Sequence, residues 1–157
     1  MRVGFSKDIH IFKNGNFIIL GGVKIPCDKS FIAHSDGDVV FHSLAEALLG
    51  SLALGDLGKY FPENDPKYDN YDSSLIVKKC YEMVKNLNYH ISNIDISIEL
   101  ENIKLKNYIE EIRKNIAKTL DIDLDKVSVK AMTNEKQDST GKGLSCISYC
   151  VVCVEEN

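Results

Sequence analysis

The segment 94–100 constrains the fold more than any other stretch of the sequence, because its apolar residues recur with a period of two. Every second position is isoleucine or leucine and the positions between are polar: Ile94, Ile96, Ile98 and Leu100 against Asp95, Ser97 and Glu99. Side chains along a β-strand point alternately to the two faces of its sheet, so this pattern predicts a strand with one buried face. The rest of the chain must supply neighbouring strands and a layer of helices to cover that face.

Three segments carry the helical periodicity expected of that covering layer. The first is predicted over 36–52, because its apolar residues recur at every fourth position. The second is predicted over 73–87, where Asp72 or Ser73 can cap the N-terminus of a helix. The third carries its apolar residues at Leu105, Tyr108, Ile109, Ile112 and Ile116.

Four further segments read as strands or strand pairs: 2–5, 11–20, 127–131 and 146–154. Within 11–20, Asn14-Gly15 predicts a hairpin turn, because both residue types accept the positive φ of a tight turn. Strands and helices mix without strict β-α-β alternation. This favours an α+β fold: one two-layer domain over residues 1–157, with one mixed sheet and helices on one face. The other face of the sheet then needs cover, and a partner subunit is its simplest source.

Length and charge exclude several classes of protein. A chain of 157 residues buries about two thirds of its unfolded surface, so it needs neither disulfides nor a metal ion to fold. The net charge of −4 argues against a nucleic-acid-binding surface, which is normally basic. The sequence contains no run of about 18 apolar residues that would span a membrane, and no secretory signal is visible at Met1. We therefore expect a cytoplasmic location, or a plastid-type organelle if an upstream transit segment has been removed.

The five cysteines do not predict a metal cluster, although the spacing of Cys146, Cys150 and Cys153 resembles one. These three residues fall in the predicted strand 146–154, where alternation puts Cys150 and Cys153 on opposite faces. An odd number of cysteines without a secretory signal indicates reduced thiols. We interpret them as small buried apolar side chains.

Histidine is rare in this chain, and three of the four histidines lie in two short stretches near the N-terminus. On a strand, Asp8 and His10 point to the same face; on a helix, Asp38 and His42 stack on one face. Asp8, His10 and His42 together offer two imidazole nitrogens and a carboxylate oxygen, which suit zinc. Three protein ligands leave the open fourth position of a catalytic site. The alternative is that these side chains only cap or satisfy the backbone of two loops.

Two loops carry residues suited to an anionic ligand. The loop 55–65 combines glycines, which allow close approach of the backbone, with carboxylates that bind hydroxyl groups, although a solvated turn is the alternative. Directly after the strand 127–131, Thr133 can bond to a phosphate and Glu135 can hold magnesium. Lys142 stands between two glycines and can reach an anion, but the P-loop pattern is absent. No motif for a protein nucleophile is present, which favours two-metal electrostatics on phosphate.

These motifs resemble the 2-C-methyl-D-erythritol 2,4-cyclodiphosphate synthase family over nearly the whole chain. The matching residues are Asp8-x-His10, His34-Ser35-Asp36-Gly37-Asp38, His42, Gly55-Asp56-Leu57-Gly58, Phe61-Pro62, Asp65-Pro66, Lys104, Thr133-x-Glu135-Lys136 and Thr140-Gly141. The resemblance implies an enzyme of the non-mevalonate isoprenoid pathway. It would cyclise 4-diphosphocytidyl-2-C-methyl-D-erythritol 2-phosphate and release CMP. It also implies a homotrimer with active sites between subunits.

The resemblance also assigns roles to residues that match the family. Zinc is implied at Asp8, His10 and His42. Magnesium or manganese is implied near Glu135, and His34 and Thr133 are implied to stabilise the transition state. Residues 100–106, with Met132 and Thr133, are implied to form the cytidine pocket of the adjacent subunit. The implied substrate-binding residues are Asp8, His10, His34, Ser35, Asp56, Leu57, Gly58, Phe61, Pro62, Asp65, Leu100, Lys104, Leu105, Met132, Thr133, Glu135 and Lys142.

The sequence departs from the family pattern at Phe5-Ser6-Lys7, Asn102-Ile103, Met132, Gln137-Asp138-Ser139 and Lys142. Ser139 and Lys142 stand where the family usually has phenylalanine and arginine. We therefore expect weak binding of an isoprenoid diphosphate on the trimer axis, with cyclisation preserved.

Three other functions compete with this interpretation. A zinc-dependent phosphohydrolase would use the same ligands but release inorganic phosphate. A non-catalytic trimeric module would bind the nucleotide without releasing CMP. A structural zinc protein is disfavoured, because three ligands leave the metal's coordination shell open.

Overall fold

The computed structural model describes residues 1–33, 35–62 and 64–157. Its main sheet has five strands in the order β4-β1-β7-β5-β6. These are β4 (Lys29–Phe31), β1 (Arg2–Asn14), β7 (Ser145–Glu156), β5 (Tyr89–Glu99) and β6 (Val127–Met132). Only the β5–β6 pair is parallel among the described pairings, so the sheet is mixed as predicted. A second sheet pairs β2 (Phe17–Leu20) with β3 (Val23–Pro26).

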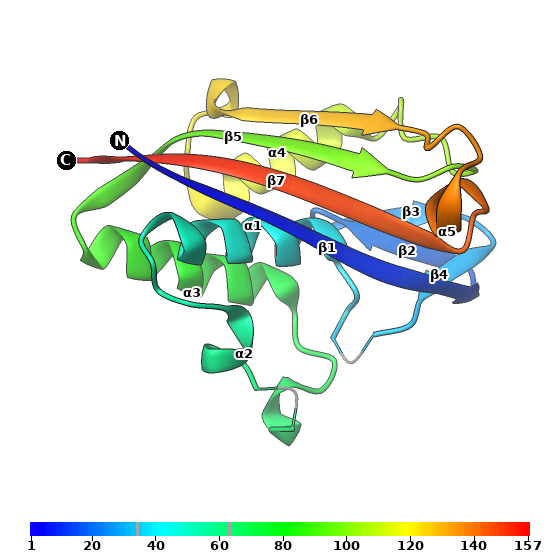
Figure 1. Ribbon diagram of the computed structural model, residues 1–157, viewed down its shortest axis with the longest axis horizontal. Coiled ribbons are helices and arrows are strands. Elements are labelled where there is room, and N and C mark those ends of the chain that lie inside the picture. Colours follow the sequence, from blue (N-terminus) through cyan, green and yellow to red (C-terminus); the bar gives the residue numbers. More distant parts are fainter. Residues whose placement is uncertain (34, 63) are drawn as a thin grey trace.

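The three long helices form a layer against one face of the main sheet (Figure 1). They are α1 (Val39–Ser51), α3 (Ser73–Asn86) and α4 (Ile109–Leu120). The short ones are α2 (Leu57–Tyr60), α5 (Asp138–Gly141) and the single 3₁₀ turns η1 (Pro66–Tyr68) and η2 (Leu124–Lys126). α1 contacts β1, β7 and α3, so it lies between the sheet and the outer helix. This arrangement confirms the predicted α+β fold.

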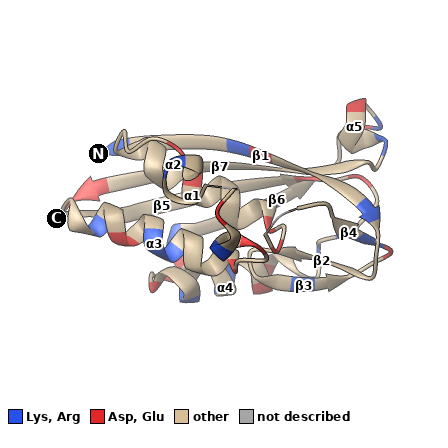
Figure 2. Cartoon of the chain, turned by 90° about the horizontal axis from the view of Figure 1, so that it is seen from below, with Lys and Arg blue, Asp and Glu red and all other residues tan. Residues whose placement is uncertain are grey.

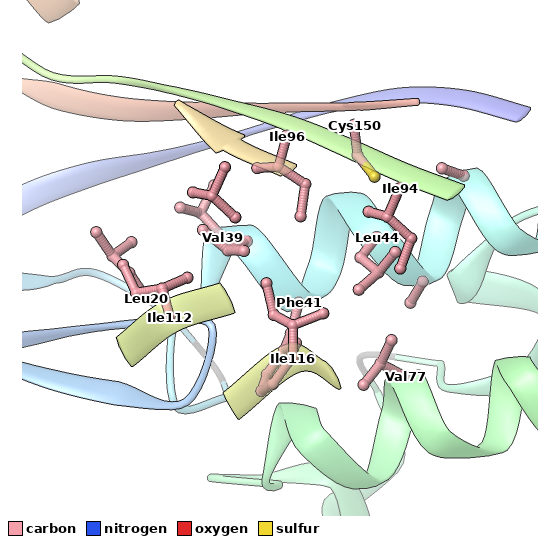
Figure 3. Close-up of a cluster of buried hydrophobic side chains, with 14 of the residues drawn as sticks. Leu20, Val39, Phe41, Leu44, Val77, Ile94, Ile96, Ile112, Ile116 and Cys150 are labelled. Carbon is pink, nitrogen blue, oxygen red and sulfur yellow. The ribbon is translucent and has the colours of Figure 1, made fainter. Parts of the chain in front are cut away.

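The core lies between the sheet and these helices (Figure 3). Ile94 and Ile96 of β5 point toward α1, and the alternate residues of this strand face the other way, as the period of two predicts. Phe41 and Leu44 of α1 are buried among them. Helix α1, which lies between the sheet and α3, is apolar on nearly every side, and this is the pattern of a buried helix.

Gly4 marks the closest approach of α1 to β1. A Cβ atom at this position would lie 1.9 Å from the carbonyl oxygen of Ala47. A contact this short is impossible for real atoms, so only glycine allows the helix backbone to rest directly on the strand.

Three local predictions were wrong. β1 does not end at Phe5 but continues to Asn14, and it pairs with β4 and β7 rather than turning back at Asn14-Gly15. The tight hairpin turn lies at Gly21-Gly22, where φ is +57° and +76°. Two glycines adopt these angles without steric cost, which explains why the turn forms there. The third long helix begins at Ile109, so Leu105 and Tyr108, which were assigned to it, lie before its first residue.

The face of the sheet opposite the helices carries exposed apolar side chains, among them Val3, Phe5, Ile9 and Ile11 of β1 and Val151 of β7. No helix covers this face within the described residues (Figure 1). On the side of the molecule shown in Figure 2, basic and acidic residues are interspersed along α3. Across the described part of the chain, every helix is too short or too polar to cross a membrane.

Candidate metal centre

Asp8, His10 and His42 converge on one point. Asp8 and His10 lie on the face of β1 that points to the helices, and His42 lies in the first turns of α1. The Oδ2 atom of Asp8 is 3.1 Å from Nε2 of His10 and 3.4 Å from Nδ1 of His42. The two ring nitrogens are 3.4 Å apart. The sequence prediction that these three residues meet is therefore confirmed.

A backbone carbonyl fixes the tautomer of His10. Its Nδ1 atom lies 2.9 Å from the carbonyl oxygen of Gly37. A carbonyl oxygen can only accept a hydrogen bond, so Nδ1 carries the proton. In the neutral ring, Nε2 then presents a lone pair to the point where the three side chains meet.

A serine fixes the tautomer of His42. The hydroxyl of Ser73, the first residue of α3, donates its proton to Oδ1 of Asp36 at 2.5 Å. The same hydroxyl oxygen lies 2.9 Å from Nε2 of His42. Because its proton is already given to Asp36, it must accept a hydrogen bond from this nitrogen. Nε2 carries the ring proton, and Nδ1 faces Asp8 with its lone pair. Such outer partners orient metal-binding histidines in many proteins.

Asp8 completes an electron-rich donor set. Its Oδ2 atom is buried and has no hydrogen-bond partner in the described part of the chain, although two ring nitrogens are close. Burial raises the pKa of Asp8, but His10 and His42 in their protonated forms lower it by more, so this group is a carboxylate. Three converging lone pairs repel one another unless a cation lies between them, so these residues fit a divalent metal ion.

A cavity of about 450 Å³ opens beside the three ligands. Among the residues predicted to bind substrate, it is lined by Asp8, His10, Ser35, Leu57, Gly58 and Phe61. Asp56 lies next to it as the N-cap of α2, where its Oδ1 accepts from the Lys59 amide at 3.0 Å. Pro62 is half-buried, and Asp65 caps η1 and pairs with Lys67 at 3.1 Å.

A second cavity, of about 440 Å³, lies near the C-terminal end of β1. Its walls include Phe12, Tyr108 and the predicted residues Leu100 and Lys104. Leu105 is buried in the core instead. The two cavities have no lining residue in common.

Thr133 and Glu135 lie in neither cavity. They follow β6, and the Thr133 hydroxyl donates to Oε1 of Glu135 at 3.4 Å. The strand order separates β6 from β1 by three strand spacings, which is about 14 Å. Met132 is exposed, and so is Lys142, the C-cap of α5. Within one chain, the metal ligands and the predicted phosphate-binding residues are therefore apart.

His34 lies outside the described residues. The prediction that Asp38 stacks with His42 on one face of the helix was wrong. Asp38 is the fully buried N-cap of α1, and its carboxylate accepts from the amides of Gly21, Gly22, Val40 and Phe41 at 2.6–3.1 Å. The carboxylate fixes the start of the helix rather than binding the metal.

The sequence interpretation missed Ser73 as a partner of His42, and it missed Glu46 in the cavity wall. Glu46 follows His42 by four residues, a spacing that puts both on one face of a helix and that the sequence alone displays. Ser73 lies 31 positions from its partner, and no local pattern indicates that contact.

Known proteins are similar to this chain in sequence and in fold. A model of the YgbB family matches residues 1–155. A protein of Brachyspira hyodysenteriae named 2-C-methyl-D-erythritol 2,4-cyclodiphosphate synthase is 45% identical over 151 residues, covering 96% of each chain. A protein of the same name from Fusobacterium nucleatum is 42% identical, covering 99% of this chain and 98% of its own. A solved structure described as IspF of Plasmodium falciparum in a CDP complex has a TM-score of 0.87 and 31% identity, over 99% of this chain and 96% of that one.

Proposed function

Because the chain belongs to the YgbB family, we propose that it converts 4-diphosphocytidyl-2-C-methyl-D-erythritol 2-phosphate into 2-C-methyl-D-erythritol 2,4-cyclodiphosphate and CMP. It is then a phosphorus-oxygen lyase of the non-mevalonate isoprenoid pathway, with one catalytic domain over residues 1–157. The observation that carries the proposal is the metal centre, where three converging donors border a cavity of about 450 Å³. Relatives matched over almost their whole length bear the name of this activity.

The reaction requires no nucleophile from the protein. An oxygen of the substrate's own 2-phosphate attacks the β-phosphorus and forms the new P–O bond. The bond from that phosphorus to the bridging oxygen breaks, and CMP leaves with the bridging oxygen. Two anionic groups must approach each other, so the protein has to fold the substrate and offset the charge that builds up.

Asp8, His10 and His42 are the residues that would hold zinc, and magnesium or manganese would lie beside Glu135. Bound cations supply charge neutralisation and polarise phosphate oxygens. In this proposal Gly37 and Ser73 keep the two imidazoles oriented, as their contacts with His10 and His42 indicate.

The remaining roles follow the cavity walls and the family resemblance. Thr133 and His34 would stabilise the reacting phosphates. The segment from Asp56 to Gly58, with Ser35, Phe61, Pro62 and Asp65 nearby, would bind the methylerythritol part. Leu100, Lys104, Leu105 and Met132 would form the cytidine pocket, and Lys142 would face an anion.

We further propose that the enzyme is a homotrimer. Two observations support this arrangement: the metal ligands and Thr133 lie three strands apart in one chain, and the uncovered sheet face carries exposed Phe5, Ile9 and Ile11. Packing that face against other copies would remove its apolar side chains from water. It would also bring residues after β6 of one copy toward β1 of another.

The direct test is to incubate the purified protein with the cytidylyl substrate, zinc and magnesium. We expect CMP by chromatography and the cyclic diphosphate by ³¹P NMR in equal amounts. Release of inorganic phosphate instead would identify a phosphohydrolase. Binding of substrate without CMP release would identify a non-catalytic nucleotide-binding module.

A further inference from the structure

Helix α1 is buried along its whole length except for one stripe. The three residues that are not buried are His42, Glu46 and Gly50, each four positions after the last. Residues spaced by four lie on the same face of a helix. The His42 and Glu46 side chains therefore point the same way, and both line the cavity beside the metal centre.

The Glu46 carboxylate makes a specific contact across this cavity. Its Oε1 atom accepts a hydrogen bond from the backbone amide of Leu57 at 3.1 Å. Leu57 is the first residue of α2, and the first amides of a helix have no acceptor within the helix. Asp56 supplies an acceptor for the Lys59 amide, and Glu46 supplies one for Leu57.

In the part of the chain that the structure describes, this is the one hydrogen bond between α2 and α1, and Leu57 and Tyr60 of α2 also pack against the core. Lys59 and Tyr60 bond to the carbonyl of Leu54, so they fix the shape of the loop itself. A helix of four residues is too short to be stable alone, so its position depends on such outside contacts.

We propose that Glu46 is a positioning residue that holds the segment Asp56–Gly58 at a set distance from the metal centre. This inference rests on the proposed function, in which the segment Asp56–Gly58 binds the polyol part of the substrate and the metal centre binds a phosphate. Glu46 lies outside the group of converging donor atoms, so its role differs from that of a metal ligand. The Leu57 amide is already engaged, and Oδ1 of Asp56 accepts from the Lys59 amide, which leaves Oδ2 of Asp56 and the Gly58 amide to contact hydroxyl groups.

Three variants of Glu46 separate positioning from other roles. Glu46→Ala removes the acceptor, and we expect KM to rise about 10- to 100-fold with zinc content and fold unchanged. Glu46→Gln retains an amide oxygen that accepts from Leu57, so we expect KM to stay within about 3-fold of the wild type. Glu46→Asp shortens the side chain and provides a second test if the alanine variant is unstable. Glu82→Ala, on the exposed side of α3, is the matched control.

Hydrogen exchange at the Leu57 amide supplies a readout that does not depend on activity. We expect exchange to be about 10-fold faster in Glu46→Ala and unchanged in Glu46→Gln. Unaltered exchange and unaltered KM in Glu46→Ala would overturn the inference, and so would loss of zinc from that variant. If the wild-type protein releases no CMP, the proposed function fails, while the exchange experiment still decides whether Glu46 fixes the loop.

Discussion

The metal centre and the residues after β6 are built in contrasting ways. His10 and His42 are each held by a neighbour from elsewhere in the same chain, namely Gly37 and Ser73. Thr133 and Glu135 are exposed at an edge of the sheet, where the hydroxyl of Thr133 bonds to Glu135. The three candidate metal ligands therefore converge within one folded chain. The second half of the proposed site depends on what packs against it.

Loss of a metal ligand should have the largest effect. We expect His42→Ala to lose nearly all its zinc and activity, because two donors remain of the three that converge. The protein should stay folded, since its core does not include the metal. Metal analysis and circular dichroism check both points. Full zinc occupancy in this variant would contradict the assignment.

Breaking the assembly should separate the two halves of the site. Phe5 is 64% exposed on the uncovered face of the sheet. We expect Phe5→Asp to yield monomers that retain one zinc per chain yet lose almost all activity, because a buried charge opposes packing. Sedimentation with metal analysis measures both. Leu87→Asp, at a site 49% exposed after α3, is the control. An active monomer would refute the shared site.

Removing an outer partner should weaken the metal centre without abolishing it. Ser73→Ala takes away the nearer acceptor for the Nε2 proton of His42, at 2.9 Å, and leaves the Ser35 hydroxyl at 3.2 Å. We expect zinc affinity to fall about 10- to 100-fold, as is common when such partners are lost. Competition with a chelator measures the change, with Ser74→Ala as the neighbouring control. Equal affinity in both variants would show that Ser73 does not orient the ring.

The smallest effect should come from the exposed half of the site. We expect Glu135→Gln to keep its zinc but to need more magnesium for half-maximal turnover, about 10-fold more, because a neutral amide binds a hard cation weakly. A magnesium titration at fixed zinc decides this. An unchanged titration would assign Glu135 a structural role.

Local spacing accounts for what the sequence predicted correctly. The alternation at Ile94, Ile96 and Ile98 predicted both the strand and its buried face. Asp8 and His10 were identified because a strand places residues two apart on one side, and His42 because it stands in a helix with a strong apolar repeat. These patterns depend on neighbours within a few positions.

Contacts between distant parts of the chain account for the errors. Asn14-Gly15 has the composition of a hairpin turn, yet β1 continues to Asn14 because β4 pairs with it from Phe12 to Asn14. Asp38 was expected to stack with His42 because their spacing is four. Its carboxylate instead accepts hydrogen bonds from the amides of Gly21 and Gly22, which hold Asp38 as the N-cap of α1. No sequence window contains both partners of these interactions.

The glycine at position 4 makes the metal site sensitive to a change that involves no ligand. With a side chain of any size there, α1 must lift from β1, because Gly4 meets the helix backbone itself. Asp8 is carried by the strand and His42 by the helix, so lifting one from the other widens the gap that a metal ion has to bridge. An inherited alanine at this position would look conservative in an alignment and would still act as a metal-site lesion. The spacing of the ligands is thus encoded partly by a missing methyl group four residues before the first of them.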